Sequence, residues 1–140
     1  MPERDGGGMP AGGDAARISR HPAPVYPGIS DSVRVRTGDL LYLSGVVGLE
    51  DDGSAPASFE RAVELAYAQL RRALGAGGAA PEDIVRVGVY IARLDDERLR
   101  VWRSVRDRIM GGGDLPASTL IGVYSLVGGA QIEIDAVAAV

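Results

Sequence analysis

Apolar and polar residues alternate along the last quarter of the chain. Apolar side chains take turns with Glu133 and Asp135 over residues 131–138, which is the period of a β-strand. A second apolar run over residues 119–126 predicts another strand, and a Gly-Gly turn separates the two. Both carboxylates must leave the sheet on the side opposite the apolar set. That side therefore either meets water or lines a site.

The same kind of pattern predicts elements through the rest of the chain. Residues 32–36 and 40–47 alternate around a Thr-Gly-Asp turn, which predicts a β-hairpin. Apolar residues then recur at helical spacing behind Ser58, a favourable N-cap, and again behind Asp95 or Asp96. The predicted helices cover residues 59–74 and 96–110, and a strand over residues 84–92 lies between them.

The order strand-strand-helix-strand-helix-strand-strand predicts an α+β fold with a mixed sheet and both helices on one face. The other face then presents Tyr42, Ser44, Tyr90, Glu133 and Asp135. This face is too apolar to be fully exposed to solvent and too polar to form a hydrophobic core. We therefore expect copies of the chain to pack these faces together, leaving polar pockets between subunits.

The first part of the chain has a different composition. Residues 1–24 are rich in Gly and Pro and have few large apolar side chains, so a disordered tail is expected. Residues 25–140 then form a single domain. No secretory signal is expected, and the sequence has no apolar run near the roughly 20 residues of a membrane span. A cytoplasmic protein without a membrane partner is expected.

Missing residue types narrow the chemistry further. The chain has no Cys and no Lys, which excludes thiol nucleophiles, thiolate metal sites and Schiff-base lysines. Its single histidine, His21, lies in a Pro-rich stretch and cannot form a zinc cluster alone. Chemistry without a metal or cofactor is therefore expected. The net charge of −4 argues against a nucleic-acid partner.

Four segments in order resemble the YjgF/Rid family of reactive intermediate deaminases. They are GDLLYLSG at residues 38–45, DIVRVGVYI at 83–91, LPAST at 115–119 and IEIDAVA at 132–138. The resemblance implies a chorismate-mutase-like fold, assembled as a homotrimer with clefts between neighbouring subunits. It also implies a small-molecule substrate, since the best-known members hydrolyse imines and enamines such as 2-aminoacrylate, release ammonia and need no cofactor.

The resemblance also assigns roles within the site. The family glutamate that positions water falls on Glu133, and the family Ser-Gly pair falls on Ser44 and Gly45. The family arginine that holds the substrate carboxylate falls on Ser118. A single hydroxyl cannot replace a bidentate, charged guanidinium, so this chain departs from the family at its substrate clamp.

Other positions have both a functional and a structural interpretation. Asp31 falls near the family tyrosine and is either a second catalytic carboxylate or a turn aspartate. Arg103 falls near a family asparagine and either reaches the cleft or lies on a solvated helix face. Ser118 is either a hydrogen-bond donor or a loop serine, and Glu133 either an acid/base or an interface carboxylate. Tyr90 is expected in or beside the pocket.

The leading hypothesis is therefore an enzyme acting on an imine, an enamine or a similarly activated molecule from a specialised biosynthetic pathway. Isomerisation, cyclisation or dehydration would need the same residues. One alternative is a non-catalytic trimer that binds a small ligand or a partner enzyme. Another alternative is ribonuclease or translation-inhibitor activity, a role reported for some family members. The excess of acidic over basic residues argues against this activity, because it disfavours RNA binding.

Overall fold

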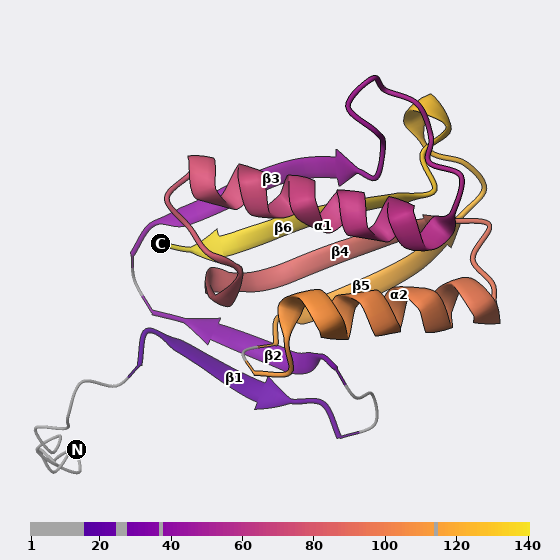
Figure 1. The fold of residues 1–140 in the computed structure, drawn as a ribbon. Coiled ribbons are helices and arrows are strands. Elements are labelled where there is room, and N and C mark those ends of the chain that lie inside the picture. Colours follow the sequence, from indigo (N-terminus) through magenta and orange to yellow (C-terminus); the bar gives the residue numbers. More distant parts are fainter. Residues whose placement is uncertain (1–15, 25–27, 37, 114) are drawn as a thin grey trace, which may run out of the picture.

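Two helices cover one face of a six-stranded sheet (Figure 1). The computed structural model describes residues 16–24, 28–36, 38–113 and 115–140. The helices are α1 (Phe59–Ala76) and α2 (Asp96–Met110). The strands are β1 (Ile18–Pro22), β2 (Ser30–Val35), β3 (Leu40–Val47), β4 (Ile84–Ala92), β5 (Ala117–Val123) and β6 (Ile132–Ala139), and the short 3-10 turns η1 (Pro81–Asp83) and η2 (Val127–Gly129) precede β4 and β6.

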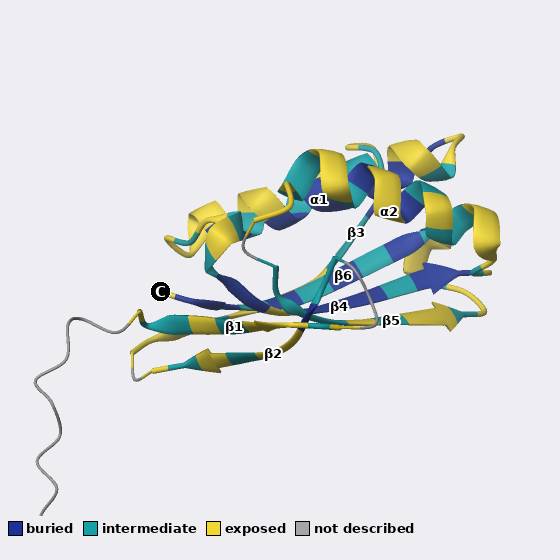
Figure 2. Ribbon diagram, turned by 90° about the horizontal axis from the view of Figure 1, so that it is seen from below, coloured by how far each residue is buried: buried dark blue, intermediate teal, exposed yellow. Residues whose placement is uncertain are grey.

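The strand order in the sheet is β1-β2-β5-β4-β6-β3. β4 lies centrally, parallel to β5 and antiparallel to β6, and β3 pairs antiparallel with β6 at the far edge. Buried residues gather between the helices and the central strands (Figure 2). The predicted mixed sheet with both helices on one face is confirmed.

Each helix begins at the residue that its sequence predicts. Ser58 accepts a hydrogen bond from the Arg61 backbone N–H at 3.1 Å, and Asp95 accepts one from the Arg98 N–H at 2.8 Å. These caps satisfy donors that the first helical turn leaves free. Among the described residues, neither helix is long and apolar enough to cross a membrane.

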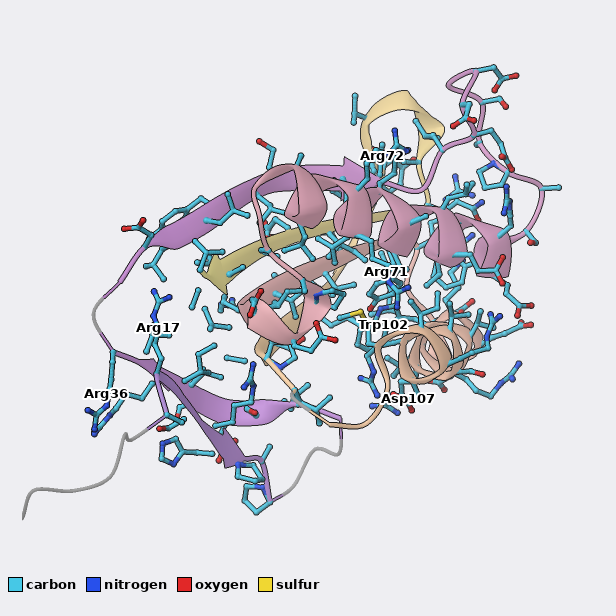
Figure 3. The ribbon with its side chains drawn as sticks, turned by 60° about the vertical axis from the view of Figure 1, so that its left-hand side comes forward. Arg17, Arg36, Arg71, Arg72, Trp102 and Asp107 are labelled. Atoms are coloured by element: carbon cyan, nitrogen blue, oxygen red, sulfur yellow. The ribbon has the colours of Figure 1, made fainter. Side chains whose placement is uncertain are left out.

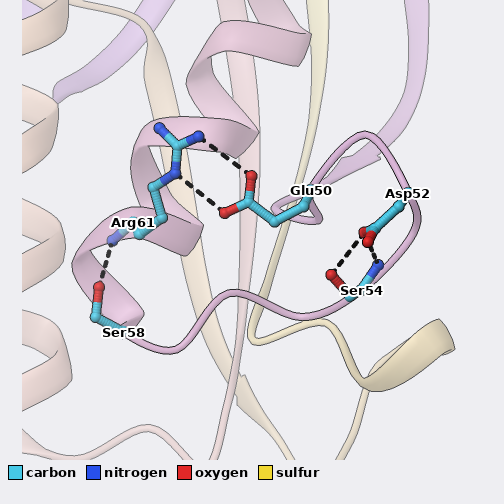
Figure 4. A network of polar contacts seen from close by, with 5 residues as sticks. All are labelled: Glu50, Asp52, Ser54, Ser58 and Arg61. Carbon is cyan, nitrogen blue, oxygen red and sulfur yellow. Dashed lines mark hydrogen bonds and ion pairs between the residues drawn. The ribbon is translucent and has the colours of Figure 1, made fainter.

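The loop between β3 and α1 is fixed by two sets of polar contacts (Figure 4). The Glu50 carboxylate accepts hydrogen bonds from Arg61 Nε and Nη2, both at 3.2 Å. Asp52 accepts from the hydroxyl of Ser54 at 2.6 Å and from its backbone N–H at 2.9 Å, and these bonds lower the pKa of Asp52. The loop is thereby tied to the first turn of α1.

The predicted disordered tail is wrong for residues 18–22, which form β1. This strand pairs antiparallel with β2. Arginine side chains anchor it to distant carbonyls. Arg17, which is labelled in Figure 3, donates to those of Asp39 and Val140, and Arg20 donates to that of Glu82. The local composition could not reveal these long-range bonds. Residues 1–15 lie outside the described residues, so a tail there stays a prediction.

The predicted hairpin of residues 32–36 with 40–47 is also wrong. β2 pairs with β1 and, at Ser30, with β5, whereas β3 pairs with β6 on the other side of the sheet. Ser30 is buried, and its hydroxyl donates to the Leu115 carbonyl at 2.7 Å. Alternation had shown that both segments are strands, but it contains no information about the partner of each strand.

Candidate functional site on the open face of the sheet

Glu133 projects from β6 on the face of the sheet opposite the helices. Its neighbours Ile132 and Ile134 are fully buried against the helices, and a strand sends successive side chains to opposite faces. Glu133 lies in register with Tyr90 on β4 and with Val47 on β3. The half-buried carboxylate is thus held by the central part of the sheet.

A β-bulge brings the backbone of β3 against this carboxylate. Leu43 pairs with Ala136 and Val46 with Ile134, so β3 has one extra residue within this stretch. A Cβ built on Gly45 would lie 2.0 Å from Glu133 Oε1. A side chain at this position would therefore force the Glu133 carboxylate to move, and Gly45 lies beside Glu133, the residue with which the family resemblance groups it.

Tyr90 and Asp135 form a second polar pair on the same face. The Tyr90 hydroxyl donates to Asp135 Oδ2 at 3.3 Å. The negative charge of Asp135, followed by burial, raises the pKa of Tyr90. Tyr90 therefore stays a protonated phenol over the physiological range, and it lies opposite Glu133 in the sheet register. The sequence predicts Tyr90 in or beside the pocket and Asp135 on the same face of the sheet.

Arg86 is a charged neighbour of this pair that the sequence analysis did not single out. Its Nη2 donates to Thr119 Oγ1 at 3.0 Å, and its positive charge lowers the pKa of Tyr90, opposing the effect of Asp135. Residues 86, 88 and 90 alternate with buried Val87 and Val89. Sequence reasoning could have found Arg86 from this spacing of two, which puts its side chain on the open face with Tyr90.

Large apolar side chains surround these polar groups and remain exposed. Tyr42 is 74% exposed and lies in register with Val137, and Ile121 is 46% exposed and lies in register with Tyr90. The open face thus combines accessible apolar surface with a few polar groups, as binding surfaces do.

Within one chain, three candidate residues lie away from Glu133. Asp31 is exposed on β2, which β5 and β4 separate from β6. Ser118 lies in register with buried Val87 and lines a hollow on the helix side of the sheet. Arg103 is exposed on α2, also on the helix side. Their roles in the site of Glu133 stay predictions that require a second copy of the chain.

The described part of the chain contains no group of three or more His, Asp or Glu side chains that could hold a metal ion. The polar groups near Glu133 are a phenol, a second carboxylate, a guanidinium and backbone groups. This set can hold water, move a proton and donate hydrogen bonds.

Residues 26–140 match the family model described as Endoribonuclease L-PSP, which is the YjgF/Rid family. The chain belongs to this family. A YjgF/Rid relative in Escherichia coli, the RutC family protein YjgH, is 32% identical over 69% of this chain and 73% of its own length. A relative in Dermatophagoides farinae, named 2-iminobutanoate/2-iminopropanoate deaminase, is 24% identical over 83% of this chain and 88% of its own.

Solved structures agree with the YjgF/Rid assignment. A Rid family protein of unknown function from Yersinia pestis, YyfB, superposes with a TM-score of 0.79 at 26% identity, covering 89% of this chain and all of that one. The solved YjgH structure gives 0.67 at 31% identity over 79% of this chain and 82% of its own. The predicted fold is therefore confirmed.

Proposed function

We propose that this protein is a cofactor-free hydrolase of imines or enamines, with Glu133 as the residue that moves a proton to and from water. The observation that supports it most directly is the position of the Glu133 carboxylate against the Gly45 backbone, on an accessible face of the sheet. The deaminase name of one relative agrees with this chemistry.

The proposed reaction needs a base and then an acid. Glu133 accepts a proton from water as the water oxygen bonds to the imine carbon, and the substrate nitrogen takes up a proton. The protonated Glu133 then gives its proton to the amino nitrogen of the resulting carbinolamine, the hydroxyl group gives a proton to water, and the carbon–nitrogen bond breaks, so that ammonia leaves and a carbonyl product remains. Tyr90 is a protonated donor near the same position. Isomerisation, cyclisation or dehydration would use the same groups for proton transfer.

The site requires a second copy of the chain in this proposal. The open face exposes Tyr42 and Ile121, which a neighbouring subunit would cover. A neighbour would also bring its own residues to the cleft, which is the only way for Arg103 and Ser118 to approach Glu133. We therefore propose the homotrimer of the family, located in the cytoplasm, with a small molecule bound between subunits.

The substrate is expected to differ from that of typical family members. Ser118 stands where the family arginine holds the substrate carboxylate, so the protein should act weakly on 2-aminoacrylate. A larger, less anionic imine, such as an intermediate of a specialised biosynthetic pathway, fits better.

A panel of imines generated in situ, from 2-aminoacrylate to larger neutral imines, tests the proposal through ammonia release. Glu133→Gln should lower turnover by about 10²–10⁴-fold, the usual contribution of a general acid/base. Exposed Glu97→Gln on α2 is the matched control and should leave turnover unchanged. If Glu133→Gln alters only ligand affinity, the protein is a binding protein instead. Fast hydrolysis of 2-aminoacrylate would refute the altered substrate preference.

A further inference from the structure

The carboxylate of Asp135 lies over the backbone of β4 on the open face of the sheet. Asp135 is in register with Gly88, and a Cβ built on Gly88 would lie 2.5 Å from Asp135 Oδ1 and 3.3 Å from the Tyr90 hydroxyl oxygen. The glycine therefore leaves the space in which the carboxylate and the phenol meet. Asp135 is partly buried there, although a carboxylate on a sheet face usually extends into water.

The Tyr90 hydroxyl has a single hydrogen atom, and this atom is directed at Asp135. The hydroxyl donates to Asp135 Oδ2 at 3.3 Å, and an ionised carboxylate can only accept. The negative charge of Asp135 raises the pKa of Tyr90, and the hydrogen bond raises it further, so the phenol keeps its proton. The lone pairs of the Tyr90 oxygen therefore remain for a different donor.

Glu133 is the acceptor that lies beside this oxygen. It precedes Asp135 by two residues on β6, so both side chains leave the same face, and it lies in register with Tyr90. Side chains directly opposite each other on antiparallel strands have Cβ atoms about 5 Å apart. A carboxylate and a phenol oxygen at this separation can each accept one hydrogen atom of the same water molecule.

Arg86 is the cation on this face that could compete for Asp135. Its Nη1 donates to the Val87 carbonyl at 2.8 Å, and its Nη2 donates to Thr119 Oγ1 at 3.0 Å. Both partners are neutral. The charge of Arg86 lowers the pKa of Tyr90, but this effect is smaller than the opposite effect of Asp135. Asp135 therefore has the Tyr90 hydroxyl as its bonded partner, and its charge acts mainly on that group.

We propose that Tyr90 and Glu133 together hold the attacking water, and that Asp135 is a positioning residue that orients Tyr90 for this role. The water donates one hydrogen atom to the Tyr90 oxygen and the other to Glu133, so a lone pair of its oxygen faces the imine carbon. Tyr90 keeps its own proton while water attacks, and Glu133 takes the proton from water. The inference rests on the proposed function, because it names the second residue that holds the water of that reaction.

A double-mutant cycle measures whether Asp135 acts through Tyr90. On the imine that wild-type protein hydrolyses fastest, Tyr90→Phe and Asp135→Asn should each lower kcat by about three- to tenfold, the effect of one hydrogen bond. KM should change by less than about twofold, because the bond matters when water attacks. Asp135→Asn should cause no further loss in Tyr90→Phe protein. Asp96→Asn, exposed on α2, is the matched control and should leave both constants unchanged.

An ultraviolet titration of tyrosinate tests the contact without any turnover. The contribution of Tyr90 is the difference between proteins with and without Tyr90→Phe. It should appear at lower pH in Asp135→Asn protein than in wild-type protein, because the charge that raises the pKa of Tyr90 has been removed. Circular dichroism confirms that each variant is folded.

The two measurements separate this inference from the proposed hydrolase. The inference is overturned if Asp135→Asn leaves kcat unchanged, or if it lowers kcat equally in wild-type and Tyr90→Phe protein. An unchanged Tyr90 titration in Asp135→Asn protein would overturn it as well. Each of these results would leave the hydrolase intact, whereas a wild-type protein that hydrolyses no imine of the panel would refute the hydrolase and this inference together.

Discussion

Gly45 and Gly48 lie close together in sequence, yet a side chain at each would meet a different kind of neighbour. A Cβ at Gly45 would contact the end of the Glu133 side chain, which can move. A Cβ at Gly48 would lie 2.0 Å from the backbone carbonyl oxygen of Ala62 in α1, which cannot move without displacing the helix. The first glycine serves the candidate site, and the second serves the packing of β3 against α1.

Alanine at these two positions should separate activity from stability. Gly45→Ala should displace the Glu133 carboxylate and lower ammonia release at least about tenfold, since misplaced catalytic groups lose rate steeply. Its free energy of unfolding should change by less than about 1 kcal/mol. Gly48→Ala should lower that free energy by about 1–3 kcal/mol through overpacking. Urea unfolding and ammonia-release assays on both variants test this prediction. It is contradicted if the two variants lose activity and stability to the same extent.

Tyr67 predicts a loss of stability at alkaline pH. Burial raises the pKa of its hydroxyl above the value in the unfolded chain, so the unfolded state releases this proton first. The contribution is fully present below the unfolded pKa of about 10 and is lost as pH rises above it. Tyr67→Phe should therefore flatten the fall in unfolding free energy between neutral and strongly alkaline pH.

Tyr124→Phe provides the control for this measurement. Tyr124 is 86% exposed, so folding changes its surroundings little. A fall that persists unchanged in Tyr67→Phe would show that another group causes it.

At the scale of elements, sequence patterns that span only a few residues predicted the helices and most of the strands correctly. Both N-caps, Ser58 and Asp95, and the apolar stripe of each helix lie where the sequence predicts them, because a helix satisfies its own backbone locally. Strand positions were also predictable from alternation. The pairing partner of each strand was not predictable. β1 pairs with β2 through the backbone, and arginines in and beside β1 bond to carbonyls far along the chain.

In the candidate site too, the face on which a residue lies could be predicted from the sequence, whereas its neighbours across the sheet could not. Glu133 and Tyr90 share a face because the period of their strands fixes it, which the sequence shows, whereas Gly45, assigned by resemblance, reaches Glu133 through the bulge in β3. Ser118 was grouped with them by resemblance, yet its register with Val87 turns it to the helix side. Arg86 was passed over because a strand arginine resembles any solvated charge until its neighbours across the sheet are known.

The cap of α1 gives a stability prediction. Ser58→Ala removes the acceptor for the Arg61 backbone N–H and should lower the free energy of unfolding by about 0.5–2 kcal/mol. Ser58→Asp keeps an acceptor at this position and should retain most of the stability. Thermal or urea unfolding checks both variants, and an equal loss in the two would mean that the cap is not the cause.

At the scale of the whole molecule, the open face is the feature that a single chain leaves unexplained. It exposes Tyr42, Ile121 and Leu40, at 74%, 46% and 45%, and the Glu133 side chain projects from the same face. A folded protein gains free energy by covering such a patch, at about 25 cal/mol per Å² of apolar area. Covering by other copies is the interpretation consistent with the proposed cleft.

Tyr42→Arg should therefore disrupt assembly and activity together. A charge in the centre of an apolar interface costs several kcal/mol when it is buried unpaired. Analytical ultracentrifugation should show a trimer for wild-type protein and smaller species for Tyr42→Arg, with ammonia release reduced in parallel. Arg72→Glu, on the exposed side of α1, is the control and should remain trimeric. A monomeric, fully active wild-type protein would contradict the proposal.

The bulge in β3 makes the geometry around Glu133 depend on the number of residues in this strand. Leu43 and Val46 keep their partners on β6 although one residue too many lies between them. A version of the chain shortened by Ser44 would retain the same ladder on both sides and could fold normally, yet its backbone would run straight past Glu133. Among relatives of this protein, a one-residue gap at that point would thus separate those that share its architecture from those that share its chemistry.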